Sequence, residues 1–528
     1  MNEQSRTINS MKNIITGFAG QFIQTLLGFF NRSIFIKFLA IEYLGISGLF
    51  SNILSMLSLA ELGVGTAIIY ALYKPLAGGN KKEITILMQF YEKAYKIIGY
   101  VVGILGLILM PFLNIIIKNA PEINENLYVL YCFYLFNTVI SYFYSYKNSI
   151  IVADQKNYIS SMVSYSISIV QTILQVLVLI ITRNFIAYLT VQLICTLAFN
   201  IIISKVADKL YPFLKIKTSD KLDEYEKKSL VKNIKALMIT KLSGVLVNNT
   251  DNMIITYFSG LITVGLSSNY TMLISIINNI LNQVFTGITA SVGNLNARES
   301  KEKKKSFFEI INFANFWMFG FSTIGIIVMI NDIINVWIGS KYILPINITI
   351  ILAINFYMVG MQNSVWTFKN TMGLFRYGRY ILLFTAALNL LLSILLGKWF
   401  GLFGILLATA ISRGLTNVWY DPYAVYRYGL ESKATEYFKR YFIFFIILVF
   451  NLLATSFICS FIIVSGIFTL LLKLIVCIVI SNFIFIILLR NNNEFNYFKE
   501  IIFNLVNSII NKKILKNYRI KLLKKRDN

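Results

Sequence analysis

Histidine is absent from the sequence, and cysteine is rare. Without histidine, the chain has no histidine-based acid–base catalysis, proton relay or metal ligand. Its four cysteines, Cys132, Cys195, Cys459 and Cys477, lie in apolar stretches with no paired spacing. They therefore predict neither a disulfide framework nor a thiolate metal site. We expect no catalytic residues and no metal site.

Proline and charged residues are also scarce: six prolines occur in 528 residues, 14% of residues are charged and 57% are hydrophobic. Such a composition does not describe a water-facing surface, so we interpret the chain as an integral membrane protein. Its apolar runs reach about twenty residues, whereas the strands of a membrane barrel show about ten alternating ones. The spans are therefore predicted to be helices.

About fourteen apolar runs are long enough to cross a membrane as helices. The weakest divisions between spans fall at Arg183–Asn184, at Ser259–Gly260 and at Lys398–Gly401. The predicted spans lie near 11–38, 44–73, 85–117, 126–150, 159–182, 185–206, 235–259, 262–290, 308–336, 346–371, 379–397, 402–426, 440–463 and 466–489.

Basic residues gather in alternate loops, as expected for an even number of spans. Of 49 lysines and arginines, about 38 fall in the loops on the side of both termini and about 7 within spans. About four, Lys118, Arg183, Lys341 and Lys398, fall in the opposite loops. This pattern predicts a multi-pass protein with both termini in the cytoplasm. It also assigns most of the net charge of +25 to topology, so we expect no nucleic acid partner.

A weak internal repeat accompanies this pattern. Gly45-Ile46-Ser47-Gly48-Leu49-Phe50 opens the second span, and Gly265-Leu266-Ser267-Ser268-Asn269-Tyr270 opens the eighth. Six helices separate the two copies, so both run in the same direction and indicate a parallel repeat. Chance similarity between apolar helices is the alternative.

The fold class that follows is all-α and polytopic, with two pseudo-symmetric six-helix lobes around a central cationic cavity. Two further helices and a basic tail complete the chain; the tail is either an amphipathic helix on the anionic inner leaflet or a partly disordered segment. The predicted boundaries are 1–206 and 235–428 for the lobes, 207–234 for a basic cytoplasmic linker, 429–490 for helices 13 and 14, and 491–528 for the tail.

Polar stripes at helical spacing mark the spans that face protein or water, because lipid offers no hydrogen bonds. They occur in the first two helices of each predicted lobe. Close packing of small residues is the alternative for the glycines and serines. The side chains predicted to line the cavity are Gln21, Gln24, Asn31, Ser55, Asn248, Ser268, Asn279 and Asn282.

Charges inside the spans need a reason, since each costs about 2.5 to 3.5 kcal/mol near mid-membrane. Arg32, Lys241 and Arg413 lie in three different helices and are predicted to converge on one anionic group. Glu61 and Asp251 are predicted to couple transport to Na+ or H+, or to balance neighbouring cations. Direct pairing, of Lys241 with Asp251 or Arg32 with Glu61, is the alternative for the cations.

Several short motifs resemble the polysaccharide repeat-unit flippases of Wzx type, in the multidrug, oligosaccharidyl-lipid and polysaccharide exporter (MOP) superfamily. The resemblance covers nearly the whole chain, although each motif is loose. The motifs are Asn31-Arg32-Ser33, Glu42-Tyr43-Leu44-Gly45-Ile46, Glu61-Leu62-Gly63-Val64-Gly65-Thr66-Ala67, Tyr73-Lys74-Pro75-Leu76, Ala153-Asp154-Gln155-Lys156, Asp251-Asn252, Gly265 and Ser268-Asn269-Tyr270.

The resemblance implies a non-enzymatic flippase that moves an undecaprenyl-diphosphate-linked oligosaccharide between leaflets of the bacterial cytoplasmic membrane. It implies that Arg32 grips the diphosphate, while Lys241 and Arg413 rest on the charge argument alone. Expected partners are this lipid, membrane lipids, a polysaccharide polymerase and glycosyltransferases; no cofactor is expected beyond a coupling ion. Three alternatives stay open: a peptidoglycan-precursor flippase, a drug/cation antiporter of the same superfamily, and a membrane-embedded glycosyltransferase or polymerase.

Overall fold

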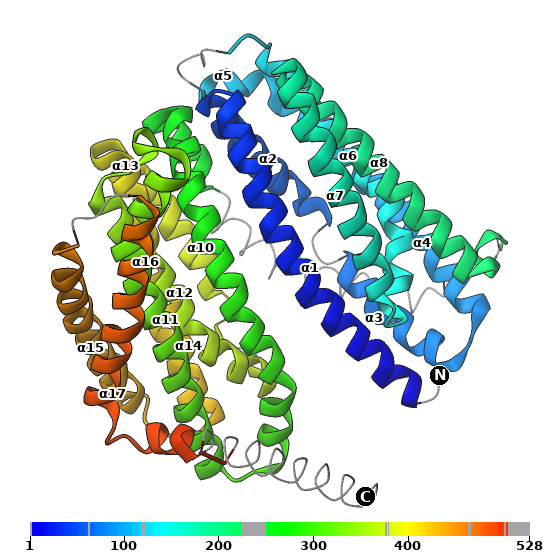
Figure 1. Cartoon of the computed structure of the whole chain (residues 1–528). Helices are drawn as coiled ribbons and strands as arrows, with labels where there is room; N and C mark the ends of the chain where they lie inside the picture. Colours follow the sequence, from blue (N-terminus) through cyan, green and yellow to red (C-terminus); the bar gives the residue numbers. More distant parts are fainter. Residues whose placement is uncertain are drawn as a thin grey trace, which may run out of the picture. The chain divides into compact units, whose positions relative to one another are not determined.

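The computed structural model is helical in the part of the chain that it describes, with no strand there (Figure 1). The described residues are 3–61, 64–117, 123–216, 250–374, 377–378, 380–462, 466–500 and 503–504, with isolated positions at 218, 220, 222 and 228. Ten helical stretches among them are long and apolar enough to cross a membrane. Many large apolar side chains are exposed on these helices, as expected for surfaces that meet lipid. The prediction of an all-α, multi-pass membrane protein is confirmed.

The first half of the chain forms the six predicted spans. Its helices are α1 (Glu3–Phe38), α2 (Ile41–Leu57), α3 (Val64–Gly78), α4 (Lys81–Leu109), α5 (Leu113–Ile116), α6 (Leu127–Ala153), α7 (Asn157–Thr182) and α8 (Phe185–Leu210). The second predicted span is built from two of them: α2 ends at Leu57, a 3-10 turn covers Ser58–Glu61, and α3 begins at Val64.

The second half is helical as well, and of its first span only the end, from residue 250, is described. Its helices are α10 (Asp251–Arg298), α11 (Lys301–Ile338), α12 (Ile346–Thr371), α13 (Ile381–Gly414), α14 (Asn417–Ala424), α15 (Thr435–Ser460), α16 (Ile467–Val476) and α17 (Asn482–Leu489). Short turns cover Ser340–Tyr342, Val425–Gly429 and Cys477–Ser481.

The three weakest predicted divisions are all real breaks. Arg183 has a left-handed backbone with φ 50° at the end of α7, and Asn184 then caps α8 by accepting a hydrogen bond from the Ala187 backbone N–H. Gly260, with φ 82°, divides α10, and Gly401, with φ 54°, divides α13. Glycine suits both positions because it adopts positive φ at no steric cost. Each long helix therefore holds two predicted spans or parts of spans.

Contacts group the chain into two compact units. The first contains Met1–Ile276, Trp337–Ile348 and Arg379–Thr416. Within it, α1 packs against α7, α7 against α8, and α6 against both α4 and α8 (Figure 1). The division into six-helix lobes at 1–206 and 235–428, with a linker between them, stays a prediction.

The second unit contains Ile277–Val336, Thr349–Gly378 and Asn417–Asn528. Phe316 of α11 stacks on Phe444 of α15, with ring centroids 4.2 Å apart, and also contacts Phe485 of α17. The trailing helices α15 and α17 thus share an aromatic core with α11. The predicted amphipathic tail lies outside the described residues from 505 onward.

Candidate functional site

Arg32 is a half-buried cation held by neutral partners. It lies in the last part of α1, and its Nε donates a hydrogen bond to Oδ1 of Asn269 at 2.9 Å. A second guanidinium nitrogen donates to the Ser268 hydroxyl. Among the described residues no carboxylate neighbours Arg32, and its electrostatic partner is the Tyr188 phenol. The positive charge of Arg32 is therefore not neutralised, as an anion-binding guanidinium requires.

Close approach of α2 and α10 brings these partners to Arg32. A Cβ atom at Gly45 would lie 2.2 Å from the Leu261 carbonyl oxygen, and one at Gly265 would lie 2.7 Å from that of Ile41. Only glycine permits helices to approach so closely at these two positions. Gly45 and Gly265 are the first residues of the two repeat motifs. The copies of the predicted repeat therefore meet each other, inside the first unit.

Two of the polar residues predicted to line the cavity from α1 form hydrogen bonds to neighbouring helices. The Gln24 amide donates to the Ser168 hydroxyl of α7 at 2.8 Å. The Asn31 amide donates to Gln175 Oε1 at 3.2 Å and to the Tyr188 hydroxyl of α8 at 2.9 Å. These bonds hold α1 against α7 and α8. Gln21, one turn before Gln24, is exposed.

An exposed polar stripe runs along α10. Thr271, Ser275, Asn279 and Thr286 follow one another at helical spacing and are exposed. Asn282, on the same stripe, accepts a hydrogen bond from the Asn363 amide at 2.7 Å. Ser51 and Ser55 form a shorter exposed stripe on α2. The Thr271 and Thr286 hydroxyls donate to backbone carbonyls of their own helix. Lipid offers no partner to an exposed amide such as that of Asn279, so the stripe is suited to a water-filled passage.

Asp251 belongs to a second cluster in the first unit. Its Oδ2 accepts a hydrogen bond from the Thr409 hydroxyl at 3.3 Å, and Thr409 accepts one from the Asn389 amide at 3.0 Å. The Arg413 guanidinium interacts electrostatically with the Asp251 carboxylate. Arg413 thus interacts with a carboxylate, whereas Arg32 interacts with none among the described residues.

Several buried oxygen atoms in and next to this cluster have no hydrogen-bond partner. Asp251 Oδ1, Asn389 Oδ1 and the Ser393 hydroxyl are buried and make no hydrogen bond. Carboxylate, amide and hydroxyl oxygens are the ligands that hard cations prefer. The donor set fits a small cation such as Na+, but Arg413 already supplies a positive charge to the same carboxylate.

Glu61 lies in a different environment, at the end of the 3-10 turn between α2 and α3. The Tyr95 hydroxyl donates to Glu61 Oε1 at 3.1 Å, and the Tyr142 hydroxyl donates to Ser58 in the same turn at 2.8 Å. In the described part of the chain, no lysine or arginine forms an ion pair with Glu61. Glu61 and Arg32 therefore have separate partners and do not pair with each other.

Lys241 and Asn248 lie outside the described residues. The residues that sequence reasoning missed are Asn269, Asn389, Ser393 and Thr409. A signal for two of them was present, since Asn389 and Ser393 are one turn apart in a strongly apolar helix. Asn269 directly follows Ser268 in the repeat motif, but nothing in the sequence indicates that it bonds Arg32.

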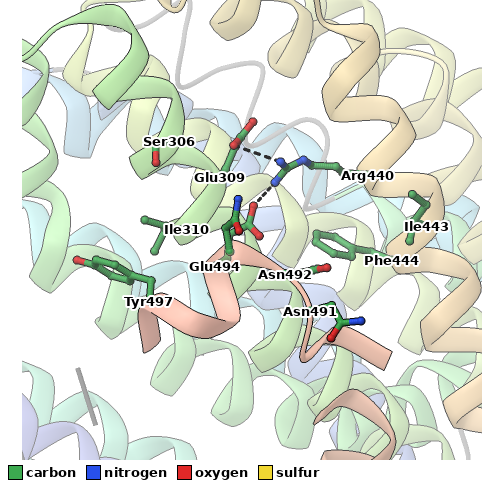
Figure 2. Close-up of a pocket in the computed structure, with 11 residues that line it drawn as sticks. Ser306, Glu309, Ile310, Arg440, Ile443, Phe444, Asn491, Asn492, Glu494 and Tyr497 are labelled. Atoms are coloured by element: carbon green, nitrogen blue, oxygen red, sulfur yellow. Dashed lines mark hydrogen bonds and ion pairs between the residues drawn. The ribbon is translucent and has the colours of Figure 1, made fainter. Parts of the chain in front are cut away.

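A polar cavity of about 520 Å³ lies in the second unit, away from these residues. Figure 2 shows Arg440 of α15 between the carboxylates of Glu309 on α11 and Glu494, which follows α17. Arg440 lies 3.2 Å from Glu309 Oε2. The two carboxylates neutralise the cation that lines this cavity, so the cavity is not suited to an anionic ligand. The ion pairs instead join the ends of three helices.

Comparison with known proteins gives the fold. No family model and no curated protein matches the chain. Among solved structures, it is similar to the lipid II flippase MurJ in an inward closed conformation, with a TM-score of 0.65 and 17% identity over 90% of this chain and 99% of that one.

Two transporters of the MATE family are also similar. An inward-facing multidrug resistance MATE transporter of the MOP superfamily gives a TM-score of 0.57 at 13% identity, over 76% of this chain and 94% of that one. A point mutant of the Vibrio cholerae MATE transporter VcmN gives 0.51 at 14% identity, over 81% and 99%. The chain therefore has the fold of MOP-type transporters.

Proposed function

We propose that this protein is a flippase that moves an undecaprenyl-diphosphate-linked oligosaccharide repeat unit from the inner to the outer leaflet of a bacterial cytoplasmic membrane. The observation that carries this proposal is Arg32: a half-buried guanidinium whose partners, Ser268 and Asn269, are both neutral. An uncompensated cation inside apolar helices is costly, and a diphosphate supplies the compensating charge.

The physical task matches the polar stripes. A sugar diphosphate cannot cross hydrocarbon unaided, whereas its polyprenyl tail can stay in lipid. The protein then needs only a polar passage with a cation in it and an opening toward the membrane. Exposed hydroxyls and amides on α2 and α10 are suited to sugar and water. Alternating access of two lobes is the mechanism expected for this fold, and no covalent step is required.

Ion coupling is part of the proposal, and the two acidic residues differ in their suitability. Asp251 has Arg413 beside it, so it is suited to balancing charge. Glu61 has tyrosine hydroxyl contacts and no ion pair among the described residues, so it is the better candidate to take up H+ or Na+. No other cofactor is proposed.

The proposed topology follows from the charge pattern, and the proposed partners follow from the family resemblance. We propose that both termini are cytoplasmic and that a polymerase and glycosyltransferases use or supply the cargo on either side. Lys241 is proposed as a further diphosphate ligand on charge alone. The proposed role of Arg413 at the diphosphate requires that it leave Asp251 during transport.

A peptidoglycan-precursor flippase is the second candidate, because the similarity to lipid II flippase MurJ extends over 90% of the chain. Both cargoes are polyprenyl-diphosphate sugars, so Arg32 serves either. A drug/cation antiporter is less compatible with an uncompensated arginine in an apolar helix, because the arginine repels a cationic drug. A glycosyltransferase or polymerase needs catalytic acids or bases at a sugar site, so this alternative is tested by asking whether the glycan is lengthened.

Reconstitution in liposomes tests the proposal. A fluorescent undecaprenyl-diphosphate oligosaccharide is incorporated, and its protection from a membrane-impermeant reagent is followed over time. Transfer between leaflets at unchanged lipid mass is expected; a lengthened glycan indicates a polymerase instead. A parallel assay with lipid II separates the two candidate functions, because only a peptidoglycan-precursor flippase is expected to transfer lipid II in preference to the oligosaccharide lipid. Absence of transfer for both lipids, with correctly folded protein, overturns the proposal.

A further inference from the structure

Another cavity, of about 450 Å³ and lined by cations, lies in the first unit where α1 ends and α2 begins. It is lined by the turn between these helices, by α10 just after its break at Gly260, and by the 3-10 turn Ser340–Tyr342. Lys37 and Lys341 are in the lining, and Glu42 is its one carboxylate. None of these residues belongs to the Arg32 site.

Arg183 adds a third cation to this region. Its guanidinium carbon lies 5.9 Å from the ring centroid of Phe38, which lines the cavity, and the Lys37 ammonium lies 5.9 Å from the same centroid. The Lys341 ammonium lies 5.0 Å from the Tyr342 ring. Among the described residues, none of the three cations forms an ion pair, and all three side chains are exposed. Their charge is therefore available to a ligand.

Topology does not explain this gathering. Lys and Arg are disfavoured in the loops on the side opposite the termini, and few occur there. Two of those few, Arg183 and Lys341, nevertheless meet Lys37 at one place, from segments far apart in the sequence. Lysines that merely extend to the nearest interface have no reason to converge. Arg183 also holds a left-handed backbone that is unusual for a residue other than glycine.

The first turn of α2 supports the same kind of ligand. Ala40, at the start of α2, provides no side-chain hydrogen bond, and Ala40, Ile41 and Glu42 all line the cavity. Free N–H groups at a helix start favour anions, in addition to the lysines. The exposed position and the apolar residues Ile262 and Leu266 in the lining suit a group attached to a lipid.

We infer that this cavity binds the phosphate group of a membrane lipid on the extracytoplasmic face. This inference rests on the proposed function: the occupant of the cavity is the diphosphate of the transferred lipid before its release. Lys37 follows Arg32 by five residues on α1, which is about 7.5 Å along the helix toward its end. The cavity thus lies about one and a half helical turns beyond Arg32, toward the end of α1. An anionic phospholipid headgroup shares this chemistry and is the other source to be separated.

Lipid binding to the full-length protein in phosphatidylcholine nanodiscs tests the inference. Undecaprenyl diphosphate and phosphatidylglycerol are titrated separately, and the bound lipid is counted by native mass spectrometry. The measurements are made in an Arg32→Gln background, which removes the other site. Lys37→Gln combined with Lys341→Gln is expected to weaken binding about tenfold, since each exposed contact contributes about threefold. Glu42→Gln is expected to strengthen it.

Two controls accompany this pair. Lys398→Gln removes an exposed lysine that does not line the cavity and is expected to change binding less than about twofold. Lys37→Arg with Lys341→Arg keeps the charges and is expected to retain binding, which separates loss of charge from loss of folding.

The outcomes separate the sources and the two proposals. Loss confined to undecaprenyl diphosphate identifies the transferred lipid, and equal loss for both lipids identifies a general phospholipid headgroup site. Unchanged binding of both lipids overturns the inference. None of these binding results depends on transport. A wild-type protein that transfers no lipid in the liposome assay therefore contradicts the proposed function and leaves the lipid-binding inference standing.

Discussion

Arg32 and Arg413 are both arginines in apolar helices of the first unit, yet their surroundings differ. Arg32 donates to an amide oxygen and a hydroxyl, so its charge is solvated but not cancelled. The Arg413 guanidinium instead interacts electrostatically with the Asp251 carboxylate. By residue type alone the two were equivalent anion ligands. The difference shows that residue type alone does not tell which arginine in an apolar helix has neutral hydrogen-bond partners and which has a carboxylate near it.

The largest expected effect comes from removing the carboxylate that interacts electrostatically with Arg413. Asp251→Asn leaves Arg413 without its carboxylate and is expected to lower the free energy of unfolding by about 3 to 5 kcal/mol. Thermal and denaturant unfolding in detergent measure this. Adding Arg413→Gln to the variant is expected to recover much of the loss. A single variant as stable as the wild type contradicts the pairing.

Removing the uncompensated cation Arg32 is expected to affect lipid transfer rather than stability. Arg32→Gln is expected to lower the rate of lipid transfer about 10- to 100-fold, the value of a charged hydrogen bond of about 1.5 to 3 kcal/mol. Stability is expected to change little, because no buried carboxylate is left unpaired. Arg490→Gln, an exposed arginine after α17, is the matched control and should transfer normally. Normal transfer by Arg32→Gln removes the diphosphate role.

The comparison can also be reversed by giving Arg32 a carboxylate. Asn269→Asp places a negative charge on the acceptor of its hydrogen bond and is expected to lower transfer about tenfold, or about 1.4 kcal/mol. Asn269→Leu, similar in size but uncharged, should reduce transfer less. If the leucine variant is the more damaging of the two, Asn269 acts by positioning Arg32 and neutrality is not what matters.

Glu61 and Asp251 also differ in their surroundings: Glu61 accepts a hydrogen bond from a tyrosine, whereas Asp251 interacts with Arg413. Glu61→Gln is expected to abolish any stimulation of transfer by a proton or sodium gradient, a change of about three- to fivefold, or about 1 kcal/mol. Transfer without a gradient should persist. Glu92→Gln, whose carboxylate pairs with Lys96 at 2.6 Å, is the control. Gradient stimulation that survives in Glu61→Gln but disappears in Asp251→Asn transfers the coupling role to Asp251.

The smallest effect is expected at Gln24. Its amide bonds to Ser168 of α7, so Gln24→Leu removes one neutral hydrogen bond and leaves a partner hydroxyl, a cost of about 1 kcal/mol in unfolding free energy. Transfer should stay within about twofold of the wild type. A larger loss of transfer, measured in the liposome assay, shows that Gln24 contacts the cargo in another conformation.

Much of the fold could be predicted from the sequence because lipid constrains it so strongly. Backbone groups in hydrocarbon must bond within their own segment, so apolar runs of about twenty residues become helices. Even the weakest divisions were correct, since Gly260 and Gly401 adopt the positive φ that breaks a helix. The interruption of the second span after Leu57 was not predicted, because Ser58–Glu61 carries no proline or other helix breaker.

The candidate site was predictable only in part. Polar spacing identified α1, α2 and α10, but it did not tell which polar residues join helices and which stay exposed. Asn31 and Gln24 bond to α7 and α8, about 140 residues away in sequence, whereas Asn279 is exposed. Helical periodicity gives the face of a residue on its own helix and nothing about the neighbour that this face meets.

What the sequence determined by itself is the membrane setting, the helical class and the number of spans, all of which follow from local composition and hydrocarbon thickness. What the tertiary structure decided is the partner of each charge: Arg413 beside Asp251, Arg32 beside Ser268 and Asn269, and Lys37 with Lys341 around one cavity. Electrostatic interaction depends on distance in space, and distant segments come close only when the helices pack.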